Sequence, residues 1–325
     1  MSPPPASILA LGGGVGGAKL ARGLAKILPP DALTVAVNTG DDFEHLGLHI
    51  SPDLDTVMYT LAGRNNLETG WGLAGETWQF MAALEALGGE TWFKLGDQDL
   101  ATHIERTRLL AEGKSLTAVT GRLAARLGVE HTIIPMSDDR VRTRVYTDQG
   151  RLAFQVYFVR MRATPEVNGI DFVGIDAATL SAPFAAAFAD KRLGAIVLCP
   201  SNPVLSIMPI LVVPGVRAMI VRRQVPLVAL SPIIGGKAVK GPAAAVMRGL
   251  GHEPSATGVA AFYRDLALDG LVIDTVDAEA APEIRAGGTE VLITDALMRD
   301  ADDSARLAAE VLAFAATLKS GRSAG

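Results

Sequence analysis

The 325-residue chain has a single cysteine, Cys199, so a disulfide framework is excluded and a reducing cytosol fits. Cys199 lies in the apolar run GAIVLCPSNP, where a buried strand residue is a better interpretation than a nucleophile. No basic block stands out and the net charge is −5, which argues against binding to a nucleic-acid backbone. A small anionic ligand is still compatible with this charge, because a local site needs only a few donors.

Long apolar runs are also missing. Proline, glycine or arginine interrupts each run before it reaches membrane-spanning length. The N-terminal MSPPPASILAL has neither the basic region nor the long apolar stretch of a signal peptide. We therefore expect a cytoplasmic protein that binds neither a membrane nor nucleic acid.

Hydrophobic residues make up 49% of the chain, which is enough for a large α/β core. Residues 7–11 have the pattern of a buried strand, and a glycine cluster, a helical stretch (18–28) and an apolar strand (33–38) follow. This order is typical of the first βαβ unit of a doubly wound fold. Further strand patterns lie at 194–199, 226–231 and 271–275, and helical patterns at 54–63, 74–87, 99–112, 116–127 and 302–318.

Two alternating segments, RVRTRVYT and RLAFQVYFVRM, flank Asp148-Gln149-Gly150 and predict an antiparallel hairpin. We therefore predict a Rossmann-like, doubly wound α/β fold with a mostly parallel sheet. Its core would comprise residues 1–135 and 193–325. A small inserted α+β lobe, residues 136–192, would contain the hairpin.

The glycine cluster GGGVGGAK matches G-x-G-x-x-G at Gly12, Gly14 and Gly17, between a strand and a helix. Residues without a Cβ let a phosphate approach backbone N–H groups at a helix N-terminus. The spacing of a Walker A loop is absent. The alternative is a tight turn without a ligand, but phosphate or pyrophosphate binding is favoured. Asn38-Thr39-Gly40 stands where an NAD site has an acidic residue, which counts against ordinary NAD binding.

An acidic stretch follows the second predicted strand. Asp53 precedes a helical pattern, and a plain N-cap is as good an interpretation of it as a functional role. Asp41, Asp42 and Asp55 are predicted to hold Mg²⁺, because paired carboxylates beside a phosphate loop are what this ion needs.

Three more polar stretches follow strand-like segments. WFKLGDQDLATH (92–103) gathers Lys94, Asp97, Asp99 and His103, although His103 on a helix is more often structural. Ser201 and Asn202 follow another strand, and so does SPIIGGKAVKGPA (231–243), with Lys237 and Lys240. A surface turn or loop is the alternative for the last two. One edge of the sheet could gather all these stretches into a phosphate-handling site.

Together these stretches resemble one family, 2-phospho-L-lactate transferase (CofD/FbiA), over roughly residues 8–260. The similar motifs are GGGVGGAKLARGL, VNTGDD, SPDLDTVMYTLAG, GWGLAGETW, WFKLGDQDLATH, PMSDD, PSNPVLSI and SPIIGGKAVKGPA. The resemblance implies a Mg²⁺-dependent, homodimeric transferase of coenzyme F-420 biosynthesis. It implies transfer of a phosphorylated three-carbon acid from a guanosine diphosphate-activated donor to the ribityl hydroxyl of the deazaflavin Fo, with release of GMP.

The resemblance also implies site residues. Asp55 and Lys94 would contact Fo, and Asp55 and Asp42 would be catalytic. Mostly by resemblance, a third group would bind the nucleotide and its phosphates: Gly13, Gly14, Gly16, Gly17, Lys19, Ser201, Asn202, Gly235, Gly236 and Lys237.

Two other functions remain open from the sequence. One is a nucleotide-sugar-binding regulator of the same fold, and the other, less favoured, is a nicotinamide oxidoreductase. The three-carbon acid, whether 2-phospholactyl, enolpyruvyl phosphate or 3-phosphoglyceryl, is not identifiable by spacing.

Overall fold

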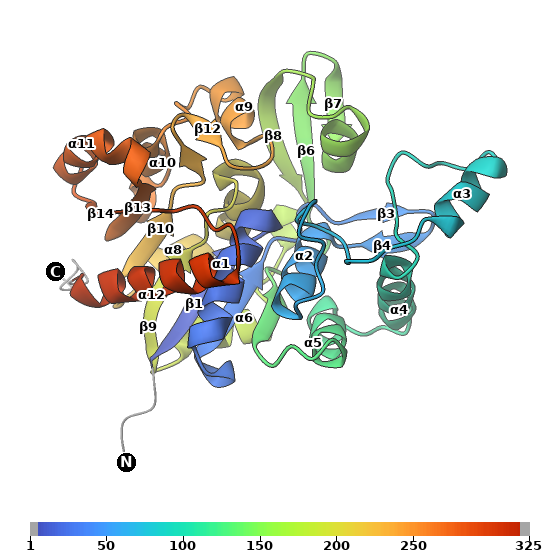
Figure 1. Ribbon diagram of the computed structural model, residues 1–325, viewed down its shortest axis with the longest axis horizontal. Helices are drawn as coiled ribbons and strands as arrows, with labels where there is room; N and C mark the ends of the chain where they lie inside the picture. The colour runs from blue at the N-terminus through green and yellow to red at the C-terminus, as the bar shows by residue number, and fades with distance from the viewer. Residues whose placement is uncertain (1–5, 319–325) are drawn as a thin grey trace.

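The computed structural model describes residues 6–318 and is built around a seven-stranded parallel sheet (Figure 1). The strand order is β14-β13-β10-β9-β1-β2-β5, and each neighbouring pair is parallel. This arrangement confirms the predicted doubly wound α/β fold. The strands are β1 (Ser7–Gly12), β2 (Leu33–Val37), β5 (Thr132–Pro135), β9 (Leu193–Leu198), β10 (Leu227–Leu230), β13 (Gly270–Asp274) and β14 (Glu290–Thr294).

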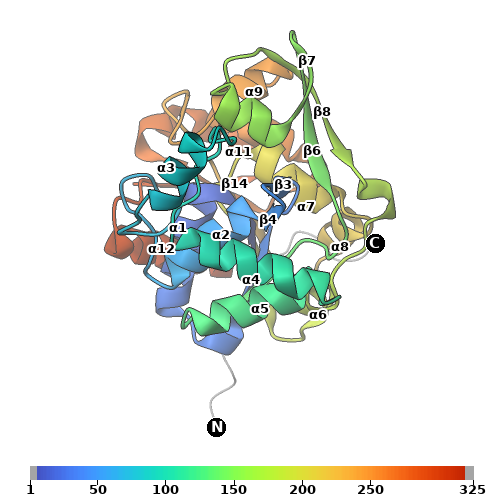
Figure 2. The same cartoon turned by 90° about the vertical axis from the view of Figure 1, so that its right-hand side faces the viewer.

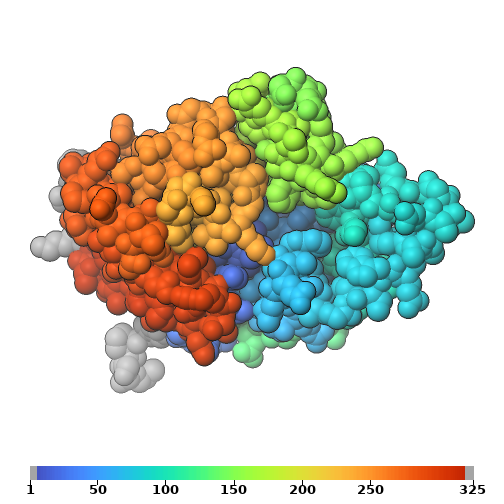
Figure 3. Space-filling model, turned by 45° about the horizontal axis from the view of Figure 1, so that its top comes forward, coloured from blue at the N-terminus to red at the C-terminus, as the bar shows by residue number. Residues whose placement is uncertain are grey.

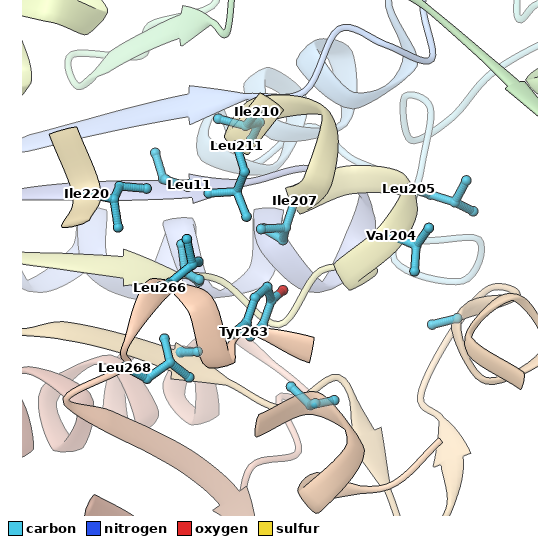
Figure 4. Packing of buried hydrophobic residues seen from close by; sticks show 14 of the residues in the cluster. Leu11, Val204, Leu205, Ile207, Ile210, Leu211, Ile220, Tyr263, Leu266 and Leu268 are labelled. Carbon is cyan, nitrogen blue, oxygen red and sulfur yellow. The ribbon is translucent and has the colours of Figure 1, made fainter. Parts of the chain in front are cut away.

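The sheet is covered on both faces, which explains why its strands have continuous apolar sequences. In β1 all six residues are buried. Ile8 and Ala10 point into one hydrophobic cluster, whereas Leu9 and Leu11 point into the other, as the period of two in a strand requires. Figure 4 shows part of the second cluster, where Leu11 and Tyr263 are among the packed side chains.

The first face carries α1 (Gly14–Ile27) and α12 (Ala301–Thr317), which lie side by side (Figure 1). Gly23 permits this close packing, since a Cβ there would lie 2.0 Å from the carbonyl oxygen of Ser304. The remaining α-helices are α2 (Pro52–Leu61), α3 (Gln79–Ala86), α4 (Asp99–Ala111), α5 (Leu116–Arg126), α6 (Ala182–Ala189), α7 (Met208–Val212), α8 (Val216–Val221), α9 (Ala243–Gly249), α10 (Ala256–Phe262) and α11 (Ala281–Ala286).

A second, antiparallel sheet has the order β7-β6-β8, with β6 (Arg142–Thr147), β7 (Gly150–Ala153) and β8 (Val167–Val173). The expected hairpin forms between β6 and β7, but its second strand ends at Ala153. A helical turn at Val156–Arg160 follows. It buries Tyr157 in the hydrophobic cluster that contains Leu9 and Leu11. The division into a core and an inserted lobe stays a prediction.

Two short hairpins complete the molecule: β3 (Phe43–His45) with β4 (Leu48–Ile50), and β11 (Ile233–Ile234) with β12 (Lys237–Ala238). The first hairpin runs from the centre of the molecule toward α3, and Figure 2 shows α4 and α5 adjacent beneath it. The segment WFKLG (92–96) was expected to be strand-like, but it is a loop in the structure.

Candidate functional site

The candidate site lies at the carboxyl ends of β1, β2, β9 and β10. At this point the strand order reverses, because β2 lies on one side of β1 and β9 and β10 lie on the other. Such a switch point leaves a crevice, and α/β proteins bind ligands there. In Figure 3 the surface is hollowed where residues near the N-terminus, in blue, lie between the orange, green and light-blue parts of the chain. The glycine loop, the acidic stretch, Ser201 and the segment 231–243 all follow these strands.

The glycine loop is joined to the turn after β9. The Gly13 N–H donates to Ser201 Oγ over 3.1 Å, and this hydroxyl donates to the Gly13 carbonyl over 2.9 Å. A Cβ on Gly16 would lie 2.1 Å from the carbonyl oxygen of Pro200, and a Cβ on Gly17 would lie 2.6 Å from Ser201 Oγ. These two glycines are therefore needed for contact between the two loops. Gly14 is the one glycine of the GGGVGG cluster with a left-handed φ, of 62°.

Asp53 lies directly beneath the glycine loop. Its Oδ2 accepts a hydrogen bond from Asn38 Nδ2 over 3.0 Å, and a Cβ on Gly13 would lie 2.0 Å from the same oxygen. Burial raises the pKa of Asp53 to about 6, against the opposing effect of hydrogen bonds from Asn38 and the Gly14 N–H. The N-cap position belongs to Ser51, so the capping interpretation of Asp53 was wrong.

Asp41 and Asp42 are buried beside Asp53. Asp41 Oδ1 accepts from Thr143 Oγ1 over 3.3 Å, which ties the acidic stretch to β6. Asp42 Oδ2 accepts from Ser51 Oγ over 2.7 Å and lies 3.1 Å from His49 Nε2, whereas its Oδ1 has no hydrogen-bond partner. Burial, followed by the charges of Asp53 and Asp42, raises the pKa of Asp41 well above its usual value.

Asp55 faces away from this group and binds α4. Both of its oxygens accept from Arg106, with 3.1 Å between Oδ2 and Nη1, and Arg106 is 1% exposed. His103 Nδ1 lies 3.7 Å from Asp55 Oδ2, and His103 Nε2 lies 3.3 Å from Asp99 Oδ2. Tyr59 donates to Asp99 over 2.5 Å.

This geometry changes the expected metal set. Within residues 6–318, Asp55, Asp99 and His103 form the one group of three such side chains whose ligand atoms lie within 4.8 Å of one another. Asp41, Asp42 and Asp55, the predicted magnesium set, do not form such a group. Sequence reasoning also missed Arg106, although its position three residues after His103 places the two on one helix face.

Lys94 is exposed, and it directly follows a cluster of aromatic rings. The centroid of Phe43 lies 4.7 Å from that of Phe93, and the centroid of Trp92 lies 5.1 Å from that of His45. Phe43, Trp92 and Phe93 are half-buried, so part of each ring is open to solvent. Because Phe43 immediately follows Asp42, this cluster begins at the edge of the acidic group.

The segment 231–243 forms the β11–β12 hairpin and carries cations toward the glycine loop. Gly235 and Gly236 have φ of 56° and 72°, and the Gly235 N–H donates to Asp277 over 3.1 Å. Lys237 is exposed. Burial and then the charge of Lys240 lower the pKa of Lys19, which donates to the Met298 carbonyl over 2.6 Å. The predicted nucleotide residues are therefore spread over three adjoining loops.

Comparisons with known proteins agree with the motifs. Residues 8–312 match the family described as 2-phospho-L-lactate transferase CofD. The chain is 44% identical to a phosphoenolpyruvate transferase of Streptomyces griseus, over 95% of this chain and 98% of that one. It is 43% identical to a 2-phospho-L-lactate transferase of Methanopyrus kandleri, over 93% and 95%.

A solved structure shares the fold alone. A member of the UPF0052 family from Bacillus halodurans superposes with a TM-score of 0.65 at 14% identity, covering 96% of this chain and 100% of that one. In the described part of the chain, no helix is both long and apolar enough to cross a membrane.

Proposed function

The chain belongs to the 2-phospho-L-lactate transferase CofD family and is a transferase of coenzyme F-420 biosynthesis, and from this premise we propose how its residues serve the transfer. A phospholactyl or enolpyruvyl group moves to Fo. In our proposal, the ribityl hydroxyl of Fo attacks the phosphorus that bears the three-carbon acid, and GMP leaves from a guanosine diphosphate donor. The observation that carries the proposal is the buried acidic group directly beside the glycine loop.

The guanosine diphosphate would lie on the β9–β10 side of the crevice. The Gly13–Ser201 hydrogen bonds hold the glycine loop and the turn after β9 together, so their backbone N–H groups can face one ligand. Lys240, whose charge acts on Lys19, brings positive potential to the same place. In the proposal these groups hold the leaving GMP, and Gly235, Gly236 and Lys237 line the outer rim.

Fo would lie on the other side, along the β3–β4 hairpin. Lys94 and the half-exposed rings of Phe43, Trp92 and Phe93 suit a flat aromatic system with polar edges. β3 leads away from Asp42 at about 3.3 Å per residue, so a ring over this cluster could extend its ribityl chain back to the acidic group. Asp55, held by Arg106, would stabilise this wall of the site.

The acidic group fits a magnesium ion. Asp42 Oδ1 is a buried carboxylate oxygen without a hydrogen-bond partner, and burial, followed by the neighbouring carboxylates, raises the pKa of Asp41. Mg²⁺ commonly binds one or two carboxylates together with substrate phosphates. We therefore propose Asp42, with Asp41 beside it, as the magnesium-binding residues; both oxygens of Asp55 are already engaged by Arg106. A bound Mg²⁺ would neutralise charge on the bridging phosphates.

Catalysis of this kind is mostly positioning and electrostatics. The backbone N–H groups of the glycine loop orient the diphosphate, and the aromatic cluster orients the acceptor. Asp53, with a pKa of about 6, lies beneath the loop and could accept the proton of the attacking hydroxyl when it is ionised. Family membership leaves no support for a nucleotide-sugar-binding regulator or a nicotinamide oxidoreductase.

The test is product formation by the purified protein. Fo and Mg²⁺ are incubated with the guanosine diphosphate derivative of 2-phospholactate, phosphoenolpyruvate or 3-phosphoglycerate, and the products are analysed by mass spectrometry. A phosphodiester of Fo and stoichiometric GMP are expected with one donor at least. No Fo phosphodiester with any of the three would overturn the proposal. Light scattering on the same preparation tests the proposed homodimer.

A further inference from the structure

A cavity of about 190 Å³ lies at the carboxyl ends of β2 and β5, one strand away from the glycine loop. Thr39 and Asp42 line it from the loop after β2, Arg140 from the connection between β5 and β6, and Arg142 from the first position of β6. The start of β6 is fixed there, since the Thr143 N–H donates to the Gly40 carbonyl over 2.7 Å. Figure 1 shows β6 reaching down to the start of β3 at this point.

Three buried polar atoms around this cavity have no hydrogen-bond partner: Thr39 Oγ1, Asp42 Oδ1 and Arg142 Nε. Buried polar groups in proteins are nearly always paired, so three unpaired atoms around one space make it suited to a polar ligand. Two of them, the hydroxyl and the guanidinium N–H, can donate to an anion. The third is the oxygen proposed above to bind magnesium.

The cavity also contains four carboxylates, but three of them are already engaged. Glu44 pairs with Arg140 over 3.2 Å, and Asp138 accepts from the Thr117 N–H over 2.6 Å. Asp139 accepts from the N–H and the hydroxyl of Thr179, both over 2.8 Å.

Arg142 is different. Within residues 6–318 its side chain makes no ion pair and only one hydrogen bond, to the Val141 carbonyl. Burial lowers the pKa of Arg142, although the negative charges of Asp42 and Glu44 act in the opposite direction. An anionic group entering the cavity could therefore pair with a half-buried arginine that has no direct ion-pair partner.

We propose that this cavity binds the carboxylate of the three-carbon acid, with Arg142 Nε and Thr39 Oγ1 as the donors. The inference rests on the proposed function and adds the subsite that recognises the transferred group. Thr39 follows β2, the strand next to β1, so a group attached to a diphosphate on the glycine loop could reach it. The nucleotide would extend the opposite way, toward β9.

The volume of the cavity favours the three-carbon acid over the deazaflavin ring as its occupant. Pockets that enclose drug-sized molecules have volumes of roughly 300–1,000 Å³. A cavity of about 190 Å³ is small for the three fused rings of Fo but has room for a three-carbon acid.

The experiment compares a donor that carries the carboxylate with an analogue that lacks it. One is the GDP-activated three-carbon acid that the wild-type enzyme uses, measured by its KM. The other is the β-ethyl ester of GDP, which lacks the carboxylate, measured by its inhibition constant. For Arg142→Ala we expect the donor KM to rise about ten- to a hundredfold, as for loss of a hydrogen bond to a charged group. The inhibition constant of the ethyl ester and the KM for Fo should not change.

Arg144→Ala is the matched control, because Arg144 lies two residues further along β6 and does not line the cavity. It should leave all three constants unchanged. Thr39→Val, which removes one donor without changing side-chain size much, should raise the donor KM in the same selective way and serves if Arg142→Ala fails to fold. Equal effects on the donor and the ethyl ester, or a raised KM for Fo, would overturn the inference. Inactivity of the wild type with every donor would instead refute the proposed function.

Discussion

Asp53 and Asp55 are two positions apart on α2, yet they belong to different networks. Asp53 lies beneath Gly13 and accepts from Asn38, whereas Asp55 accepts from Arg106 on α4. Residues two apart on a helix point to nearly opposite sides. The SPDLD motif therefore provides two separate contacts of α2. One is with the glycine loop, and the other is with α4.

The first contact predicts that Gly13→Ala is severely damaging. The added Cβ would lie 2.0 Å from Asp53 Oδ2, and relieving this overlap must displace either the loop or the helix. We expect about 1–3 kcal/mol of lost stability and much weaker GDP binding. Thermal unfolding and GDP titration measure both. Gly121→Ala on α5 is the control, since nothing lies within 4 Å of its Cβ, and it should be neutral or slightly stabilising.

The second contact predicts a large effect of breaking the Asp55–Arg106 pair. Both side chains are buried, so Arg106→Leu leaves the Asp55 carboxylate without its guanidinium partner, and we expect a loss of about 3–5 kcal/mol in the free energy of unfolding. Arg108→Ala, on the same helix, removes exposed pairs with Glu105 and Glu112 and should cost less than about 1 kcal/mol. Urea unfolding that gave equal losses for the two variants would contradict the buried-pair argument.

The fold was accessible from sequence because its signals are local. The apolar run at 7–11, the glycines at 12–17 and the strand at 33–38 each carry their pattern within a few residues, and together they specify a βαβ unit. The strand-like interpretation of WFKLG (92–96) was wrong, since its aromatic residues pack against the β3–β4 hairpin rather than joining a sheet.

The site was less accessible because its details depend on distant contacts. No local pattern shows that Asp53 meets Gly13 or that Arg106 meets Asp55 51 residues away. In the sequence Arg142 is one of several arginines in a strand pattern, and only the three-dimensional packing reveals that its buried Nε has no hydrogen-bond partner. The motifs identified loops that follow β1, β2, β9 and β10, whereas the contacts of the individual carboxylates could be described only from the structure.

The raised pKa of Asp53 predicts that the free energy of unfolding depends on pH. Its pKa of about 6 in the folded protein exceeds the usual value of 3.8, so folding favours the protonated carboxyl. The stabilising contribution is fully present below pH 3.8 and is lost as the pH rises through 6, by about 3 kcal/mol. Asp53→Asn removes this pH-dependent contribution to stability. The difference in unfolding free energy between variant and wild type should therefore change across pH 4–6, and a constant difference would contradict the raised pKa.

The magnesium proposal predicts that chelation abolishes transfer. Activity should disappear in excess EDTA and return with added Mg²⁺. Asp42→Asn should lower the apparent Mg²⁺ affinity at least tenfold, because it removes the charge of the carboxylate that has a free oxygen. Glu44→Gln is the control, since Glu44 pairs with Arg140 at the surface. Full activity of the wild type in EDTA would eliminate the metal from the mechanism.

The proposed position of Lys94 beside Fo predicts that its loss affects binding of the acceptor but not binding of the nucleotide. Lys94 follows the aromatic cluster, and an ammonium there can reach the polar edge of a deazaflavin ring over Phe43 or Trp92. Loss of one charged hydrogen bond costs about 1.5–3 kcal/mol, roughly ten- to more than a hundredfold in affinity. Lys94→Ala should weaken Fo binding by this factor and leave GDP binding unchanged, as followed by Fo fluorescence and by GDP titration. Lys114→Ala, an exposed lysine after α4, should change neither. If Lys94→Ala instead weakened GDP and spared Fo, Lys94 would belong to the donor side, and the acceptor would have to be placed elsewhere in the crevice.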